Sequence, residues 1–302
     1  MTLGSSASVS DPGRRRRRNE DSFVCEPPLF AIADGMGGAQ AGEVASGLAA
    51  AVLAEGGGEE RGAERVRALI EEANRRVFRR SNEDAAVSGM GTTMTVALVD
   101  ADAGVIVLGH VGDSRAYRVR NHELEQLTDD HSLVGELTRS GKLSREEAET
   151  HPQRSVITRA VGTEPDVDVD VETIPFEPGD VYLLCSDGLT DMVSDGEILA
   201  LVDGSSGLDE AARALVAAAN HGGGEDNITV VLFQPDGEPA EQLDDDEDTL
   251  SGLEPVPVVE APLATAEPEP AAADSGRRLF PLLLLALLVL AIAALAIWGL
   301  TR

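Results

Sequence analysis

Short apolar runs, separated by polar and glycine-rich segments, mark the first 234 residues of the chain. Six of these runs are rich in β-branched or aliphatic residues and end near Gly, Asp or Pro, which is typical of strands. They are residues 29–33, 92–99, 105–111, 116–119, 181–185 and 228–233. The short gaps between the second, third and fourth runs predict that these three pair in antiparallel fashion.

Two further segments repeat their apolar residues with the period of a helix. The pattern that begins at Val66 predicts a helix over residues 62–80, and the one that begins at Leu208 predicts a helix over 207–220. Strands and helices are therefore mixed along one region, and residues 1–234 are expected to form a single domain. No repeat divides this region further.

The end of the chain has a different pattern. From Leu279 to Leu300 all 22 residues are apolar, Gly or Pro, and a helix of that length crosses a hydrocarbon core of about 30 Å. Arg277 and Arg278 precede the segment, so by the positive-inside tendency the long N-terminal part faces the cytoplasm. We therefore expect residues 277–302 to be a single-pass membrane helix with a short tail.

The distribution of charge distinguishes residues 235–276 from the N-terminal region. Residues 235–276 contain thirteen Asp or Glu and no Lys or Arg, and they are rich in Pro and Ala. Such a segment buries too little apolar surface to order itself, so it is expected to be a disordered acidic linker. Of the total charge of −30, residues 1–234 carry −20, and a body this acidic repels a phosphate backbone. Nucleic acid is therefore not an expected partner.

Four acidic strings stand out in the acidic body. Each places a carboxylate beside a turn-forming residue, and at least three lie at or next to the end of an apolar run: Asn19–Asp21, Asp34–Gly38, Ser186–Gly188 and Glu225–Asn227. Carboxylates that a fold gathers repel one another and need a compensating charge. Hard divalent cations with oxygen ligands, Mn²⁺ or Mg²⁺, supply it. The strings therefore predict a metal site.

Eight motifs in order resemble the metal-dependent PP2C-type serine/threonine protein phosphatases, in their bacterial branch. The resemblance covers roughly residues 8–234. The motifs are RRRNEDS at 16–22, ADGMGG at 33–38, GEVAS at 42–46, GMGTT at 89–93, VGDSR at 111–115, TRAVG at 158–162, CSDGLTD at 185–191 and EDNIT at 225–229. A single motif would be weak evidence, but their common order is specific.

The resemblance implies an α+β fold in which two antiparallel β-sheets pack as a sandwich flanked by helices. It implies hydrolysis of phosphoserine and phosphothreonine in proteins by a metal-bridged hydroxide that attacks phosphorus in line. Two Mn²⁺ or Mg²⁺ ions, with a possible third, would be the cofactors. Ser/Thr protein kinases and their substrates would be the partners, at the inner face of the cell membrane.

Roles transfer to this chain by motif position. Asp34 is expected to bridge two ions, with the Gly35 carbonyl on one of them, and Asp187 and Asp226 complete the first site. Glu20 or Asp21 matches the acidic pair near the second ion. The possible third site matches Asp113 and Asp191.

The resemblance also assigns phosphate binding to Arg16, three residues before Asn19. A guanidinium grips phosphate with two parallel hydrogen bonds. Because residues 14–18 are all arginine, Arg17 or Arg18 could partly substitute. Read alone, five arginines would indicate a flexible basic patch.

The acid that protonates the leaving oxygen is left open. Some eukaryotic relatives carry a histidine at the position of Met36, and a thioether cannot donate a proton. His151 lies just before the TRAVG motif, where the family has a mobile flap, and a solvent-exposed or packing histidine is the simpler interpretation. Cys25 and Cys185 lie in apolar runs and are expected to be buried hydrophobic residues.

Two other functions also fit the pattern. One is a catalytically weak, phosphatase-like regulatory module that binds partners, although the retention of Asp34, Gly35, Asp187 and Asp226 argues against a decayed site. The other is a metal phosphohydrolase that acts on small phosphorylated metabolites. No residue pattern selects between proteins and metabolites as substrates.

Overall fold

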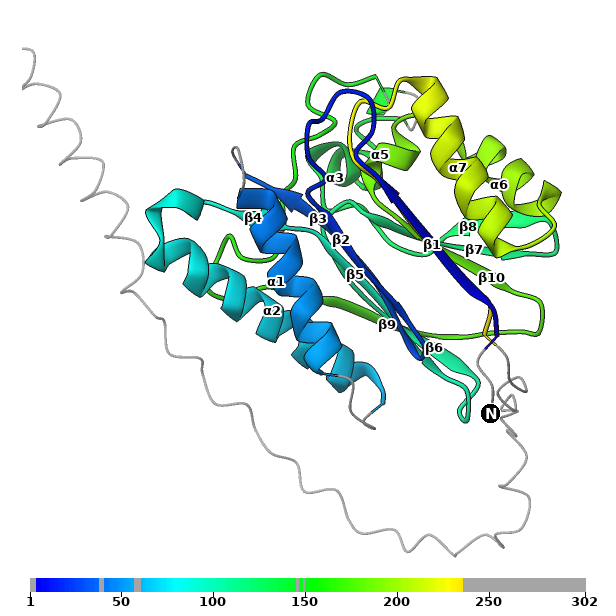
Figure 1. Ribbon diagram of the computed structural model, residues 1–302, viewed down its shortest axis with the longest axis horizontal. Helices are drawn as coiled ribbons and strands as arrows, with labels where there is room; N and C mark the ends of the chain where they lie inside the picture. The colour runs from blue at the N-terminus through cyan, green and yellow to red at the C-terminus, as the bar shows by residue number, and fades with distance from the viewer. Residues whose placement is uncertain (1–3, 38–40, 57–60, 145–146, 149, 236–302) are drawn as a thin grey trace, which may run out of the picture. The chain divides into compact units, whose positions relative to one another are not determined.

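The computed structural model describes residues 4–37, 41–56, 61–144, 147–148 and 150–235. In this part of the chain the strands form two antiparallel sheets with helices outside them (Figure 1). No helix among the described residues is long and apolar enough to cross a membrane. The expected membrane helix, and the linker from residue 236 onward, lie outside the described residues.

The first sheet has five strands in the order β1-β11-β10-β7-β8. Its bounds are β1 Ser6–Asp11, β11 Ile228–Phe233, β10 Val181–Cys185, β7 Arg115–Arg120 and β8 Glu123–Gln126. The strand β11 is buried along its whole length, which explains its continuous apolar sequence.

The second sheet has the order β2-β3-β5-β6-β9, with the short β4 paired to the end of β3. Its bounds are β2 Asp21–Glu26, β3 Leu29–Met36, β4 Gly91–Thr92, β5 Met94–Asp100, β6 Val105–Val111 and β9 Asp170–Pro175. Its strand pairings are all antiparallel.

The two sheets pack face to face through an apolar layer. Phe30 of β3 stacks on Phe233 of β11 with ring centroids 4.1 Å apart, and Tyr182 of β10 stacks on Phe233 at 5.4 Å. Ile32 and Ile106 from the second sheet lie in the same buried cluster. Burial of this many large side chains, at about 25 cal/mol per Å² of apolar surface, is what holds a sandwich together.

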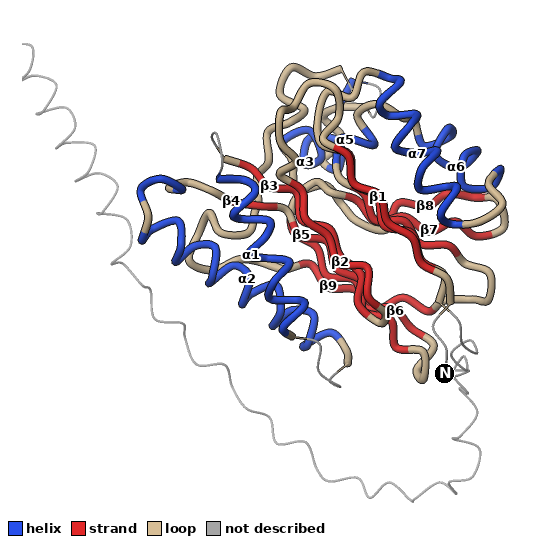
Figure 2. The backbone as a smooth tube through the Cα atoms, in the orientation of Figure 1, coloured by secondary structure: helices blue, strands red, loops and turns tan. Residues whose placement is uncertain are grey.

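Helices cover the outer faces (Figure 2). On the second sheet lie α1 Ala41–Glu55 and α2 Ala63–Glu83, and on the first lie α6 Asp195–Gly204 and α7 Leu208–Gly222. Shorter helices are the 3₁₀ turn η1 Ala85–Val87, α3 Leu133–Arg139 and α5 Asp187–Thr190. The expected α+β sandwich is therefore confirmed.

The predicted strands and helices are found, with two corrections. The predicted strand 92–99 is divided into β4 and β5 at Thr93. The N–H of Thr93 donates a hydrogen bond to the Asp34 carbonyl at 2.8 Å. The predicted strand 116–119, β7, does not continue the antiparallel series after β6. It crosses to the other sheet and pairs with β10 and β8.

Strand ends from both sheets meet at one edge. In the first sheet, the end of β1 pairs with the start of β11, Asp11 opposite Ile228. In the second sheet, the start of β2 pairs with the end of β3, so Asp21 lies directly opposite Asp34. The end of β10 and the turn between β6 and β7 reach the same edge. This edge is where the acidic strings come together.

Candidate active site

The predicted carboxylates arrive at this edge from separate elements. Asp34 lies near the end of β3, Asp187 begins α5 directly after β10, and Asp226 lies two residues before β11. Asp113 occupies the turn between β6 and β7, and Asp21 begins β2. Residues far apart in the sequence thus form one acidic cluster, as the strings predicted.

The pKa values of the cluster show how closely it is packed. Burial raises the pKa of Asp34 and of Asp187 well above the ordinary range, and the neighbouring carboxylates raise both further. Burial likewise raises the pKa of Asp21 to about 6 and that of Asp113 to about 7. Carboxylates that are deprived of water and placed beside like charges favour a proton or a cation. The cluster therefore favours the binding of positive charge.

Two oxygens of the cluster point to a cation. Asp21 Oδ1 and Asp187 Oδ1 are buried and lack any hydrogen-bond partner among the described residues. Buried carboxylate oxygens without a donor are costly unless a positive ion takes them. The set consists only of hard oxygen donors, which suits Mn²⁺ or Mg²⁺.

Neighbouring side chains already hold some of the carboxylates in the cluster. Within the described ranges, no group of three His, Cys, Asp or Glu is close enough to hold a metal as it stands. Asp21 Oδ2 instead accepts hydrogen bonds from Ser186 Oγ at 3.0 Å and Thr229 Oγ1 at 2.6 Å. Asp226 Oδ2 accepts a hydrogen bond from Arg16 Nη2 at 2.6 Å. Two hydroxyl groups and Arg16 thus hold two of the carboxylates in place.

Two glycines allow the backbones at the site to approach closely. A Cβ on Gly35 would lie 2.2 Å from the Gly42 carbonyl oxygen, and a Cβ on Gly188 would lie 2.0 Å from the Asn227 carbonyl oxygen. Both distances are far inside van der Waals contact. The Asp-Gly pairs at 34–35 and 187–188 therefore bring the start of α1 and of β11 against the carboxylates, a role beyond that of a simple turn.

Threonine and serine side chains fix the backbone of Asp34, a feature that the sequence interpretation missed. Thr93 Oγ1 accepts the Asp34 N–H at 2.9 Å, and Thr92 Oγ1 donates to the Asp34 carbonyl at 2.8 Å. Thr93 Oγ1 also bonds Ser114 Oγ at 2.7 Å, which ties the turn of Asp113 to the same group. These hydroxyl residues belong to the GMGTT and VGDSR motifs, which could have indicated their role.

Arg16 lies beside the cluster, as predicted. Its Nη2 donates to Asp226 Oδ2 at 2.6 Å, and about half of its side chain is exposed. Partial burial would lower the pKa of Arg16, but Asp226, and then Glu20 and Asp34, raise it above the ordinary value. A permanently charged guanidinium with one open side next to the carboxylates is well placed to receive an anion.

Glu20 and Asp191 lie at the margins. Glu20 is half-buried, and burial, with Asp226 and Glu43, raises its pKa. Asp191 is more exposed and pairs with Arg154 at 3.3 Å. Asp191 still contributes to the raised pKa of Asp187 and Asp113. Both residues thus lie near the cluster, Glu20 half-buried and Asp191 exposed.

Asn227 holds the loop between β1 and β2, which carries Arg16, against the site. The sequence interpretation assigned Asn227 no role. Its Oδ1 accepts the Glu20 N–H at 2.8 Å, and its Nδ2 donates to the carbonyls of Pro12 at 3.1 Å and Arg18 at 2.9 Å. One buried amide therefore grips both ends of the loop that carries Arg16. We infer that Asn227 is a positioning residue for Arg16.

Asn227→Ala is expected to raise KM for a phosphopeptide roughly tenfold, because two or three net hydrogen bonds hold the loop. Asn74→Ala is a matched control: Asn74 also accepts one N–H, from Gly162, and donates to two carbonyls, those of Glu164 and Pro165. Both variants should lose a similar amount of thermal stability. An equal rise of KM in Asn74→Ala would contradict the positioning role.

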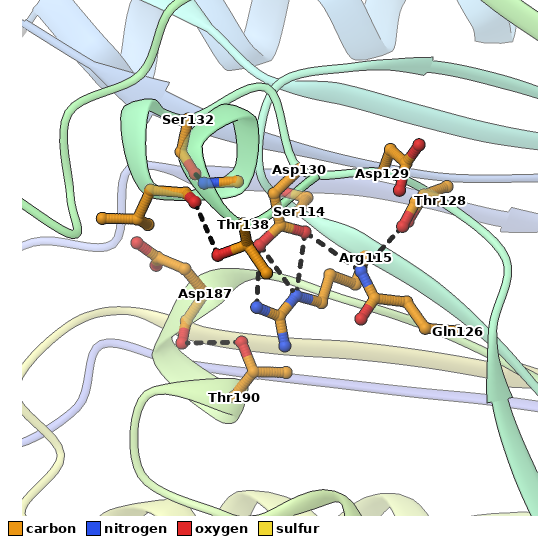
Figure 3. A network of polar contacts seen from close by, with 12 residues as sticks. Ser114, Arg115, Gln126, Thr128, Asp129, Asp130, Ser132, Thr138, Asp187 and Thr190 are labelled. Atoms are coloured by element: carbon orange, nitrogen blue, oxygen red, sulfur yellow. Dashed lines mark hydrogen bonds and ion pairs between the residues drawn. The ribbon is translucent and has the colours of Figure 1, made fainter. Parts of the chain in front are cut away.

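A cavity of about 760 Å³ opens beside the carboxylates, between α3 and α5. Asp113 and Asp187 form part of its wall. On the other side, Arg115 grips Asp130 through Nε at 2.9 Å and Nη2 at 2.7 Å, and Figure 3 shows this pair across from Asp187. The cavity therefore borders the acidic cluster directly.

Other candidates from the sequence are placed as follows. Met36 ends β3 beside the cluster and offers no proton. His151 Nδ1 accepts a backbone N–H from Gln153 at 3.2 Å. His110 is buried and bonded to Thr95 at 2.9 Å, and burial lowers its pKa to about 4. Of the cysteines, Cys185 is buried as expected, whereas Cys25 is only half-buried.

Comparison with known proteins identifies the family. Residues 15–220 match the model of the protein phosphatase 2C family. The serine/threonine phosphatase stp of Listeria monocytogenes is 41% identical over 239 residues, which cover 75% of this chain and 94% of that protein. The crystal structure of the phosphatase PstP/Ppp of Mycobacterium tuberculosis is 40% identical, with a TM-score of 0.73, over 78% of this chain and all of that one.

The two-sheet sandwich and the similarity to these proteins together define the class as a protein phosphatase. The chain belongs to the protein phosphatase 2C family, and it is a serine/threonine protein phosphatase. Such phosphatases use Mn²⁺ or Mg²⁺. A structure of the PstP catalytic domain, 38% identical with a TM-score of 0.69 over 76% of this chain and 97% of that one, is a complex with two manganese ions.

Proposed function

We propose that the acidic cluster at the sheet edge is the catalytic centre, where phosphoserine and phosphothreonine side chains of proteins are hydrolysed. The observation that carries this proposal is the meeting of Asp21, Asp34, Asp113, Asp187 and Asp226 with Arg16 at one edge. Two divalent ions held by the carboxylates would supply an activated water and neutralise phosphate charge. A third divalent ion, held by Asp113 and Asp191, is part of the proposal.

The residues of the chain bind and orient the substrate. Arg16 would exchange its contact with Asp226 for the phosphoryl oxygens, and its fork suits two parallel hydrogen bonds. The cavity between α3 and α5 gives the peptide beside the phosphorylated residue a place to lie. In the reaction the bond from phosphorus to the Ser or Thr oxygen breaks, water supplies the new oxygen, and the departing oxygen takes a proton. The products are a free hydroxyl side chain and inorganic phosphate.

We further propose that the phosphatase acts at the inner face of the cell membrane, on Ser/Thr protein kinases and their substrates. The apolar segment 279–300, with arginines before it, supports this location. The acidic linker 235–276 would let the catalytic domain extend away from the membrane surface. Activation loops of membrane kinases are then the nearest phosphorylated segments.

Deletion of residues 277–302 tests the location. The full chain should sediment with membranes, and the deleted chain should move to the soluble fraction while it keeps its activity on phosphothreonine peptides. Phosphorylation of membrane kinases should rise in cells that carry the deletion. The Asp187→Asn variant serves as the control, since it should lose activity but stay with the membranes. A full chain in the soluble fraction would contradict the proposal.

A further inference from the structure

The loop between β1 and β2 carries a strong local positive charge. Arg14 to Arg18 are five consecutive arginines, all exposed, in a body of net charge −20. Asp226 holds Arg16 at 2.6 Å, and Glu43 lies 3.6 Å from Arg18. Arg14, Arg15 and Arg17 remain outside these two ion pairs.

Those three arginines stand apart from most others in the protein. Within the part of the chain that the structure describes, the side chains of Arg14, Arg15 and Arg17 have no hydrogen bond or ion pair. Elsewhere, arginines are commonly paired with carboxylates: Arg75, Arg76, Arg80, Arg115, Arg118, Arg120, Arg139, Arg154 and Arg159. With Asp and Glu more than twice as numerous as Lys and Arg, three unpaired arginines within four residues are an unusual concentration.

The loop that presents them is held in place. The backbone N–H groups of Arg14 and Arg15 donate to the Gly224 carbonyl at 2.7 and 3.2 Å. Asn227 grips the loop at Pro12 and Arg18. Figure 1 shows the loop beside α5, at the edge where the strands end. A fixed loop loses less entropy when an anion binds than a flexible tail would.

We propose that Arg15 and Arg17 form a second anion-binding subsite, which selects protein substrates with acidic residues close to the phosphorylated residue. The proposal rests on the phosphatase function, with the phosphate held at Arg16. Arg15 and Arg17 flank Arg16, and extended peptide residues lie about 3.3 Å apart. On this proposal, glutamates within about three positions of the phosphorylated residue contact these two exposed guanidinium groups.

Two phosphothreonine peptides test the subsite on the full chain. They differ only in two residues next to the phosphothreonine, which are glutamates in one and alanines in the other. The wild type should favour the acidic peptide about 3- to 10-fold in kcat/KM, since exposed ion pairs are individually weak. The preference should lie in KM and shrink as salt rises from about 0.05 to about 0.3 M, because the Debye length shortens.

Arg15→Gln/Arg17→Gln should bring the ratio of the two kcat/KM values close to one. Arg79→Gln/Arg213→Gln is the matched control, since it removes the same charge from exposed arginines on α2 and α7, and it should keep the wild-type ratio. Equal kcat/KM of the wild type for both peptides, or the same loss of preference in both variants, would overturn the subsite alone. Hydrolysis of neither peptide would instead overturn the proposed function.

Discussion

Asp187→Asn is expected to reduce phosphatase activity roughly 10²- to 10⁴-fold and, in the same protein, to raise the melting temperature of the metal-free form. Loss of a ligand removes several kcal/mol of charge stabilisation in a metal-assisted hydrolysis. The gain in stability of the metal-free form comes from the removal of charge repulsion. Asp187 is half-buried beside Asp113, Asp191, Asp226 and Asp21, and each of them repels its charge. An amide of the same shape ends that repulsion.

The pH dependence of the metal-free protein follows from the same carboxylates. A carboxyl whose pKa is raised on folding holds its proton more strongly in the folded state, so stability falls as pH rises from the unfolded pKa to the folded one. Asp21 and Asp113, with pKa values of about 6 and about 7, place this fall between about pH 4 and 7. The lowered pKa of His110 and His131 acts in the opposite direction.

Thermal melting in chelator and in excess Mn²⁺ separates these effects. In chelator, the wild type should melt at a higher temperature at about pH 5 than at about pH 7, because the carboxyls with a raised pKa outnumber the two histidines whose lowered pKa opposes them. Mn²⁺ should stabilise the wild type by mass action and stabilise Asp187→Asn much less. A variant that melts below the wild type in chelator would contradict the account of repulsion.

Arg16→Ala is expected to reduce kcat/KM for a phosphothreonine peptide about 10- to 100-fold, mainly through KM. The guanidinium would supply charge-assisted hydrogen bonds to phosphate, which are worth about 1.5–3 kcal/mol each. Neighbouring arginines on the same loop could compensate in part, so the lower end of the range is expected. Inorganic phosphate should also inhibit the variant more weakly than the wild type.

Arg16→Lys and Arg79→Ala are the controls for this prediction. Lysine keeps the charge without the planar fork, so it should restore only part of the affinity. Arg79 is exposed on α2, and its replacement should leave KM unchanged. If Arg16→Ala changed kcat while KM stayed the same, Arg16 would act in the chemical step and not in phosphate binding.

The pattern of the sequence predicted the strands that contain an apolar run and missed β1, β2, β8 and β9, which have few buried residues. β6, β10 and β11 were placed at their observed bounds, since their apolar runs lie wholly inside the sandwich. β2 exposes Phe23 and buries only Val24, and β9 is mostly exposed, so neither has a continuous buried apolar run. The crossing of β7 to the other sheet depends on contacts with β10 that spacing along the chain does not encode.

The same distinction applies to the site. Asp34, Asp187 and Asp226 were predictable because the residue types and their order resemble a family. The contacts that hold them were not, because Thr93 bonds Asp34 across 59 positions and Asn227 bonds Glu20 across 207. Such contacts arise only when distant strand ends meet. The pairing of Asp226 with Arg16 likewise became visible only in the fold.

Phosphate release from a phosphothreonine peptide, followed as Mn²⁺ is added to the chelator-treated full chain, tests the central claim most directly. The wild type should be inactive without metal and become active as Mn²⁺ increases, whereas Asp187→Asn should stay at least about 100-fold less active at every concentration. Equal activity of the two proteins, or release by the wild type without any divalent ion, would contradict the assignment of this carboxylate cluster as the catalytic metal site.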